Sequence, residues 1–121
     1  MRPRLHYLTK EEVQPEELGV LNYILEEEYN SKNSNGCQMR LQKKRKILEA
    51  INPPDSLLGH VEVNGENSET VLRTLKKLSK AIPRLTWILY GENKIFNGEI
   101  QIKAGKILSE RKEVESRKIY L

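Results

Sequence analysis

The amino-acid sequence predicts an α+β fold, in which N-terminal helices are followed by a β-α-β-β-β antiparallel sheet packed on one helix. Three stretches support this fold class. Residues 68–82 repeat apolar side chains at helical spacing, residues 85–90 are apolar at almost every position, and residues 96–104 alternate between apolar and polar side chains. No known protein family is identified by these patterns.

The stretch 68–82 predicts a helix with two different sides, around which the rest of the chain is organised. Ser68 is a typical N-cap residue and Pro83 cannot continue a helix, so these two residues set the expected ends. The apolar side must face a core, and the basic side must face solvent or an acidic partner. The apolar side consists of Val71, Leu72, Leu75, Leu78 and Ile82, and the basic side of Arg73, Lys76, Lys77 and Lys80.

The strands on either side of this helix are predicted from shorter patterns. Residues 57–64 predict a strand with Val61 and Val63 on one face and His60 on the polar face, where we expect a surface histidine. The apolar run 85–90 is typical of a central strand that is buried on both faces.

Two further strands are predicted after the central one. Residues 96–104 alternate with a period of two, which indicates a half-buried strand. Ala104 and Gly105 provide a tight turn into residues 106–112, which we expect at or near a sheet edge. The lysine and arginine side chains of this last strand would oppose pairing with another chain.

The N-terminal part predicts an extended segment and then a helix. Pro3 blocks one ladder bond, so residues 1–8 are expected as an arm or an edge strand. Residues 9–12 have the form of a capping box, and Pro15 marks a second helix start. We expect a helix over residues 15–29, with three glutamates near its C-terminal end, where the helix dipole disfavours them unless a basic partner is close. Its apolar face consists of Leu18, Leu21, Leu25 and Tyr29.

The middle of the chain predicts a loop and another helix. Residues 30–36 contain no apolar side chain and are rich in turn formers, which predicts a mobile loop. Residues 37–51 then predict a second helix, which ends before Pro53 and Pro54. This boundary divides one compact domain into an N-terminal helical segment, 1–52, and an α+β core, 53–121.

Composition and charge narrow the class of protein. The chain has 121 residues, of which 37% are hydrophobic and 31% charged, as expected for one soluble domain with no membrane span. The single cysteine excludes an internal disulfide and favours a cytoplasmic location. The net charge of +4 is uneven: residues 1–36 hold four Lys and Arg against seven Glu, whereas residues 57–121 hold twelve against eight.

The sequence does not contain the motifs of the common catalytic sites, so we expect no enzyme, no cofactor and no metal site. Two histidines and one cysteine lie far apart, whereas a metal site needs several ligands at suitable spacing. Neither of the usual phosphate-binding glycine motifs occurs. Cys37 begins a predicted basic helix but has no recognisable base nearby, so a partly buried, unreactive cysteine is the simpler interpretation.

Two groups of basic side chains are the predicted binding surfaces, because they would attract an anionic partner. The first is Arg73, Lys76, Lys77 and Lys80 on the two-sided helix, extended by Arg84, and the second is Arg40, Lys43, Lys44, Arg45 and Lys46.

The leading hypothesis is therefore a small binding protein that acts on another protein as a regulator, an inhibitor or an immunity-type factor. The alternative is a protein that binds DNA or RNA through its basic helix faces. Aromatic residues make up 6% of the chain and none lies inside a basic group, which weakens the nucleic-acid hypothesis. The identity of the partner and the oligomeric state stay open.

Overall fold

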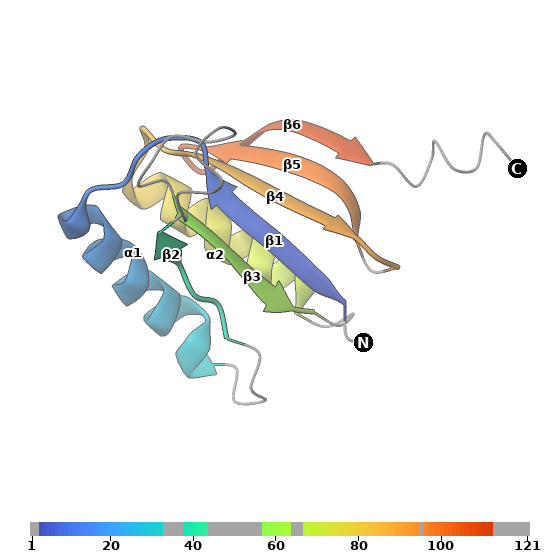
Figure 1. Ribbon diagram of the computed structural model, residues 1–121, viewed down its shortest axis with the longest axis horizontal. Helices are drawn as coiled ribbons and strands as arrows, with labels where there is room; N and C mark the ends of the chain where they lie inside the picture. Colours follow the sequence, from blue (N-terminus) through green and yellow to red (C-terminus); the bar gives the residue numbers. More distant parts are fainter. Residues whose placement is uncertain (1–2, 33–37, 44–56, 64–66, 95, 113–121) are drawn as a thin grey trace, which may run out of the picture.

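The computed structural model describes residues 3–32, 38–43, 57–63, 67–94 and 96–112 (Figure 1). The elements, in chain order, are β1 (Arg4–Thr9), α1 (Pro15–Glu28), a 3₁₀ turn η1 (Asn30–Lys32), β2 (Gln42–Lys43), β3 (Leu57–Glu62), α2 (Ser68–Ala81), β4 (Thr86–Glu92), β5 (Asn97–Lys103) and β6 (Lys106–Lys112).

The described strands form one six-stranded sheet in the order β2-β3-β1-β4-β5-β6, and every neighbouring pair is antiparallel. Helices α1 and α2 pack beside each other and share one hydrophobic core with the sheet (Figure 1). The expected α+β class with an antiparallel sheet is therefore confirmed.

The core lies between the helices and one face of the sheet. Alternate residues of the strands point into it, because successive side chains of a strand lie on opposite faces. Both helices contribute the apolar sides that their sequences predict. The buried side chains include Leu5 and Tyr7 from β1, Leu21 and Leu25 from α1, Val61 from β3, Leu75 and Leu78 from α2, Trp87 and Leu89 from β4, and Ile100 and Ile102 from β5.

Strand β1 lies inside the sheet, between β3 and β4, so the expectation of an arm or an edge strand is wrong. Pro3 precedes the strand, and its missing N–H therefore interrupts no ladder within β1. The Pro3 carbonyl instead accepts a hydrogen bond of 2.9 Å from the Val63 N–H.

No helix begins at residues 9–12, although their pattern resembles a capping box. Thr9 ends β1, and its hydroxyl accepts the Leu57 N–H at 2.9 Å. The Glu11 carboxylate accepts two hydrogen bonds from Thr86, from its N–H and from its hydroxyl. The contact to Leu57 thus uses the Thr9 hydroxyl, which a helix cap would need. Helix α1 begins at Pro15 as the second signal predicts.

Helix α2 confirms the prediction of a two-sided helix, but its N-cap lies one residue before the expected one. Asn67 occupies the N-cap position and Ser68 is the first helical residue. The Asn67 side chain makes no cap hydrogen bond, and its amide N–H groups donate to the Tyr29 hydroxyl at 2.9 Å and to the Glu62 carbonyl at 3.1 Å. The cap residue thus joins α1, β3 and α2.

The helix expected over residues 37–51 is wrong where the structure describes it. Residues 38–41 are irregular, and Gln42 and Lys43 form the short strand β2 beside β3. Residue 37 and residues 44–51 lie outside the described residues. Of the expected loop over residues 30–36, the first three form η1 and the rest also lie outside the described residues.

Strand β4 is central but is not buried on both faces. Trp87 and Leu89 are fully buried against the helices, whereas Ile88 is half-buried and Tyr90 is 38% exposed on the opposite face. The expectation fails because α1 and α2 lie on the same face of the sheet. None of the described helices is long and apolar enough to cross a membrane.

Candidate functional site

The basic residues predicted on α2 lie on its outer side, and part of their charge is used within the molecule. Arg73, Lys77 and Lys80 are exposed, and Lys76 is half-buried. The Lys77 ammonium lies 2.5 Å from the Glu28 carboxylate at the end of α1. This is the basic partner that the glutamates at that helix end require. The hydrogen bond from Lys77 is the main reason why the pKa of Glu28 lies below its ordinary value.

Arg84 forms a second link between the acidic and the basic part of the chain. Its guanidinium donates to the Glu17 carboxylate and to the Glu12 carbonyl, the latter at 3.0 Å. The pKa of Glu17 is lowered first by the hydrogen bond from the Gln14 N–H, at 2.9 Å, and then by Arg84. The Lys77–Glu28 and Arg84–Glu17 ion pairs are exposed to solvent. They therefore orient the acidic and the basic part of the chain relative to each other and add little to the stability of the fold.

The second predicted basic group is only partly described. Arg40 is exposed on the segment that leads into β2, and Lys43 lies in β2. Lys44, Arg45 and Lys46 lie outside the described residues. Arg40 is placed against the edge of β3, which the sequence does not suggest.

The face of the sheet opposite α1 and α2, here called the open face, carries a row of three rings on its central strands. His60 on β3 lies beside His6 on β1, and His6 lies beside Tyr90 on β4. The rings of His6 and Tyr90 are stacked, with centroids 5.1 Å apart and an angle of 18° between their planes. The His6 and His60 rings are tilted, with centroids 6.1 Å apart.

A parallel row of aliphatic side chains runs beside the ring row. Leu58, Leu8 and Ile88 lie next to one another across β3, β1 and β4, and all three are half-buried. The next position of the ring row is Glu99 on β5, which lies 3.9 Å from Arg111 on β6. The open face thus combines an apolar centre with charged side chains of both signs.

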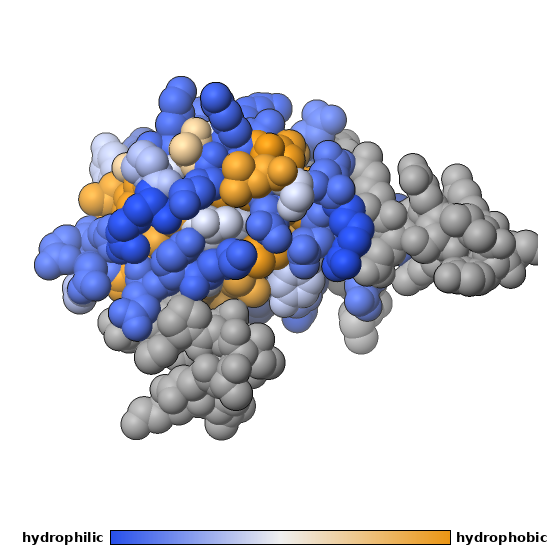
Figure 2. All heavy atoms as spheres, turned by 90° about the horizontal axis from the view of Figure 1, so that it is seen from above, coloured by the Kyte–Doolittle hydropathy of each residue, from blue (hydrophilic) through white to orange (hydrophobic). Residues whose placement is uncertain are grey.

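The side of the molecule on which β6 lies carries both hydrophilic and hydrophobic side chains. Seen from the side on which β6 lies in Figure 1, separate hydrophobic groups are surrounded by charged and polar ones (Figure 2). A hollow of about 980 Å³ begins beside His6 and Tyr90. Its other lining residues are Pro3, Arg4, Gly91, Glu92, Asn93 and Lys94.

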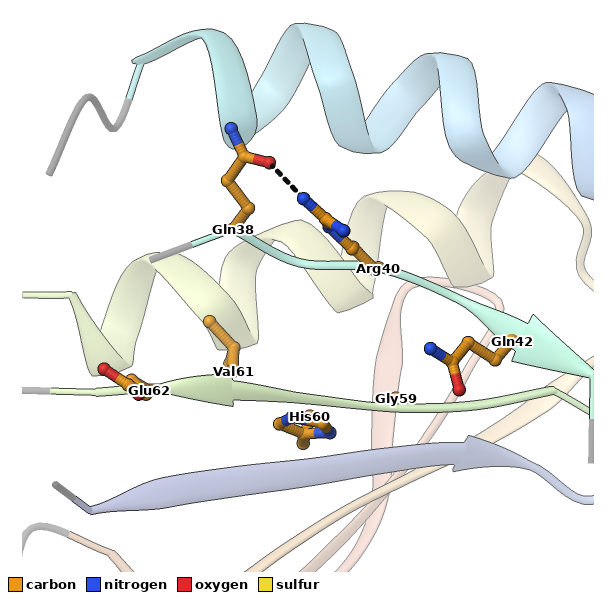
Figure 3. A pocket seen from close by; sticks show the side chains of 7 residues that line it. All are labelled: Gln38, Arg40, Gln42, Gly59, His60, Val61 and Glu62. Atoms are coloured by element: carbon orange, nitrogen blue, oxygen red, sulfur yellow. Dashed lines mark hydrogen bonds between the residues drawn. The ribbon is translucent and has the colours of Figure 1, made fainter. Parts of the chain in front are cut away.

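A smaller depression of about 310 Å³, here called the edge groove, lies between β3 and the segment that leads into β2 (Figure 3). Figure 3 shows His60 and Val61 on opposite sides of β3 and the hydrogen bond of 3.3 Å from Arg40 to the Gln38 side chain. The lining residues are Gln38, Arg40, Gln42, Gly59, His60, Val61 and Glu62. His60 therefore belongs to the open face and to the edge groove.

The edge groove is held open by contacts to the main chain of residues 39 and 40. The Tyr7 hydroxyl donates to the Arg40 carbonyl at 2.8 Å and accepts the Arg40 N–H at 2.9 Å. The Asn30 side chain accepts the Met39 N–H at 2.8 Å and donates to the Met39 carbonyl at 3.0 Å. Burial raises the pKa of Tyr7 well above its ordinary value, which keeps the hydroxyl protonated as a donor.

Gly59 is required beside this contact. A Cβ atom at this position would lie 2.1 Å from the Arg40 carbonyl oxygen and 2.5 Å from the Tyr7 ring. The absence of a side chain therefore allows the Arg40 peptide and the Tyr7 ring to meet over β3.

His6 is the group on the open face whose titration is shifted: burial lowers its pKa, and His60 and Arg4 lower it further. Among the described residues, no group of three or more His, Cys, Asp or Glu side chains could hold a metal ion. Cys37 lies outside the described residues.

Sequence reasoning identified His60 as a surface histidine but missed His6, Tyr90 and the contact between Tyr7 and Arg40. The position of His6 between the apolar residues Leu5 and Tyr7 could have indicated its place. Successive side chains of a strand lie on opposite faces, so His6 must lie on the face opposite Leu5 and Tyr7. The pairing of these rings across three strands depends on β1 entering the sheet centre. No family model, no curated protein and no solved structure matches this chain.

Proposed function

We propose that this chain is a non-enzymatic protein-binding module that docks on its partner with the open face and acts as a regulator or an inhibitor. The observation that carries the proposal is the ring row of His60, His6 and Tyr90 beside the aliphatic row on a face that no described helix covers. A patch of apolar and aromatic side chains with a polar rim is typical of a protein interface.

The charges around the rows favour a protein over a nucleic acid as partner. The open face has Glu62 and Glu99 as well as Arg4 and Arg111, so it lacks the single sign that a polyanion requires. The stacked rings of His6 and Tyr90 also cover each other's faces, which leaves less ring surface for a nucleotide base.

The nucleic-acid alternative rests on the exposed basic side of α2. Arg73 and Lys80 point to solvent, whereas Lys77 and Arg84 are engaged with Glu28 and Glu17. This alternative predicts binding to generic DNA or RNA that falls steeply as salt rises, and a smaller salt slope after Arg73→Ala and Lys80→Ala. Absence of binding at low salt would rule it out.

The docking proposal is tested by affinity capture from a nuclease-treated native lysate of the source organism, with matched variants. Tyr90→Ala and Leu8→Asp alter the open face, and Tyr23→Ala removes a 67% exposed tyrosine from α1 as the control. We expect one partner that the unmodified chain and Tyr23→Ala retain and that both open-face variants lose. Equal retention by all variants, or a loss confined to Tyr23→Ala, would contradict the proposal.

A further inference from the structure

We propose that the outer edge of β3 accepts an extended segment of the partner protein as an added strand, with an acidic side chain of that segment facing Arg40. This inference rests on the proposed function and specifies which part of the partner is recognised. In strand addition, main-chain hydrogen bonds supply affinity and the neighbouring side chains supply specificity.

The direction of the main-chain groups of β3 follows from two hydrogen bonds. The Leu57 N–H points to Thr9 at 2.9 Å, and the Val63 N–H points to Pro3 at 2.9 Å, so both point toward β1. Main-chain groups of a strand alternate in direction from one residue to the next. The N–H and C=O groups of the residues with even numbers therefore point away from β1, toward the outer edge.

Within this outward set, His60 is the residue that the described part of the sheet does not pair. Leu58 faces Gln42 in the short ladder with β2, and the Glu62 carbonyl accepts the Asn67 amide. If the register of β2 continued, Arg40 would lie opposite His60. The ladder between β2 and β3 instead contains only the pairs at residues 42 and 43.

Arg40 does not continue the ladder because the Tyr7 hydroxyl binds both of its peptide groups. The Arg40 carbonyl lies where a Gly59 side chain would point, which is the helix side of β3. The segment that contains Arg40 thus passes over the strand and leaves the lateral edge open. Its contacts to Tyr7 and Asn30 mean that the opening exists before a ligand arrives.

The dimensions and charges of the edge groove fit an extended peptide. The open edge between His60 and Glu62 corresponds to about three residues of a strand. Its volume of about 310 Å³ is small for a folded element. The Arg40 guanidinium is exposed above the opening, where it can bind a carboxylate through paired hydrogen bonds. Glu62 at the other end opposes a second acidic side chain.

The test uses the full chain and a phage library of random linear peptides as the probe. Selected peptides are synthesised and titrated into isotope-labelled protein, with and without N-methylation of single peptide amides. Arg40→Glu removes the proposed carboxylate contact. Arg73→Glu makes the same charge change at an exposed site on α2 and is the matched control.

We expect selected peptides to contain Asp or Glu and to shift the resonances of residues 38–42 and 58–62. The amide proton of His60 should exchange more slowly when the peptide is bound. N-methylation of the pairing amide should weaken binding about tenfold, the size of one lost main-chain hydrogen bond. Arg40→Glu should weaken binding by a similar factor, and Arg73→Glu should leave it unchanged.

In the peptide experiments, four results would overturn the inference. These are no peptide selected, equal binding of every N-methylated peptide, displacement of the peptide by acetate as a small carboxylate, and slower His60 exchange that depends on protein concentration alone. The last two would assign the edge groove to a small anion and to a second copy, respectively. A captured partner that is lost with Tyr90→Ala but unaffected by Arg40→Glu would refute strand addition and leave the proposed function intact.

Discussion

The two faces of the sheet are built from the same strands but differ in what covers them. On the helix side, Leu5 and Tyr7 of β1 and Trp87 and Leu89 of β4 are fully buried. On the open face, the residues that alternate with them, among them His6 and Tyr90, are half-buried or exposed. The covered and the uncovered side chains of this sheet therefore differ by a single step along each strand.

The type of side chain alone does not distinguish a core position from a position on the open face. Ile88 is as apolar as Leu89, yet Leu89 is buried under the helices and Ile88 is half-buried in the aliphatic row of the open face. The free energy of burial follows from the covering layer, because it scales with the apolar area removed from water.

The largest expected effect compares one residue of each face of β4. Trp87→Ala removes a fully buried side chain and should lower the free energy of unfolding by about 3–5 kcal/mol. Tyr90→Ala removes a partly exposed ring and its stack with His6, and should cost about 1 kcal/mol or less. Urea unfolding of both variants measures the difference.

Trp87→Phe separates the effect of the indole N–H from that of the lost side-chain volume at this buried position. The Trp87 Nε1 is buried without a hydrogen-bond partner in the described residues, so its removal leaves no other group unsatisfied. This variant should lose much less stability than Trp87→Ala. A loss for Tyr90→Ala as large as that for Trp87→Ala would show that the open face also belongs to the core.

A smaller effect is expected from alanine in place of two glycines. Gly59→Ala places a methyl group 2.1 Å from the Arg40 carbonyl and should lower the free energy of unfolding by about 1–3 kcal/mol. Gly19→Ala is the control, because no atom of the described residues outside its own stretch of α1 lies within 4 Å of its Cβ position. It should raise stability by up to about 1 kcal/mol. Equal effects in urea unfolding would contradict the close contact at Gly59.

The smallest effect is a pH dependence that belongs to the open face. Burial, His60 and Arg4 hold the pKa of His6 below the value of 6.5 that it has in the unfolded chain. The unfolded chain therefore binds this proton more readily, and stability falls as the pH drops from 6.5 toward the lowered pKa. Above pH 6.5 His6 is neutral in both states, so this loss of stability is absent.

Two variants check the origin of that dependence. His6→Gln should remove this part of the stability loss on acidification. His60→Gln removes the neighbouring imidazole and should raise the pKa of His6, as followed by its ring proton resonances in an NMR titration. An unchanged His6 titration would show that the two rings do not interact.

More of the fold than of the candidate site could be predicted from the sequence. Periodicity identified α1, α2, β3 and β5, because each of these elements buries one side against the shared core, whereas β6 was predicted from the turn at Ala104 and Gly105. The place of β1, the open second face of β4 and the irregular segment before β2 were not predicted. Each depends on long-range packing: β1 is joined to β3 through Pro3 and Val63, the second face of β4 is open because both helices pack on the other face, and the segment before β2 is held by the contact of Tyr7 with Arg40.

The sequence by itself determined which side chains of α2 and of the strands turn toward a core, since spacing and polarity act within each element. Only the tertiary structure decided that both helices cover the same face, that β1 enters the centre of the sheet and that His60, His6 and Tyr90 meet. The physical reason is that these outcomes depend on pairing between distant segments, and a local pattern contains no information about which strand will be its neighbour.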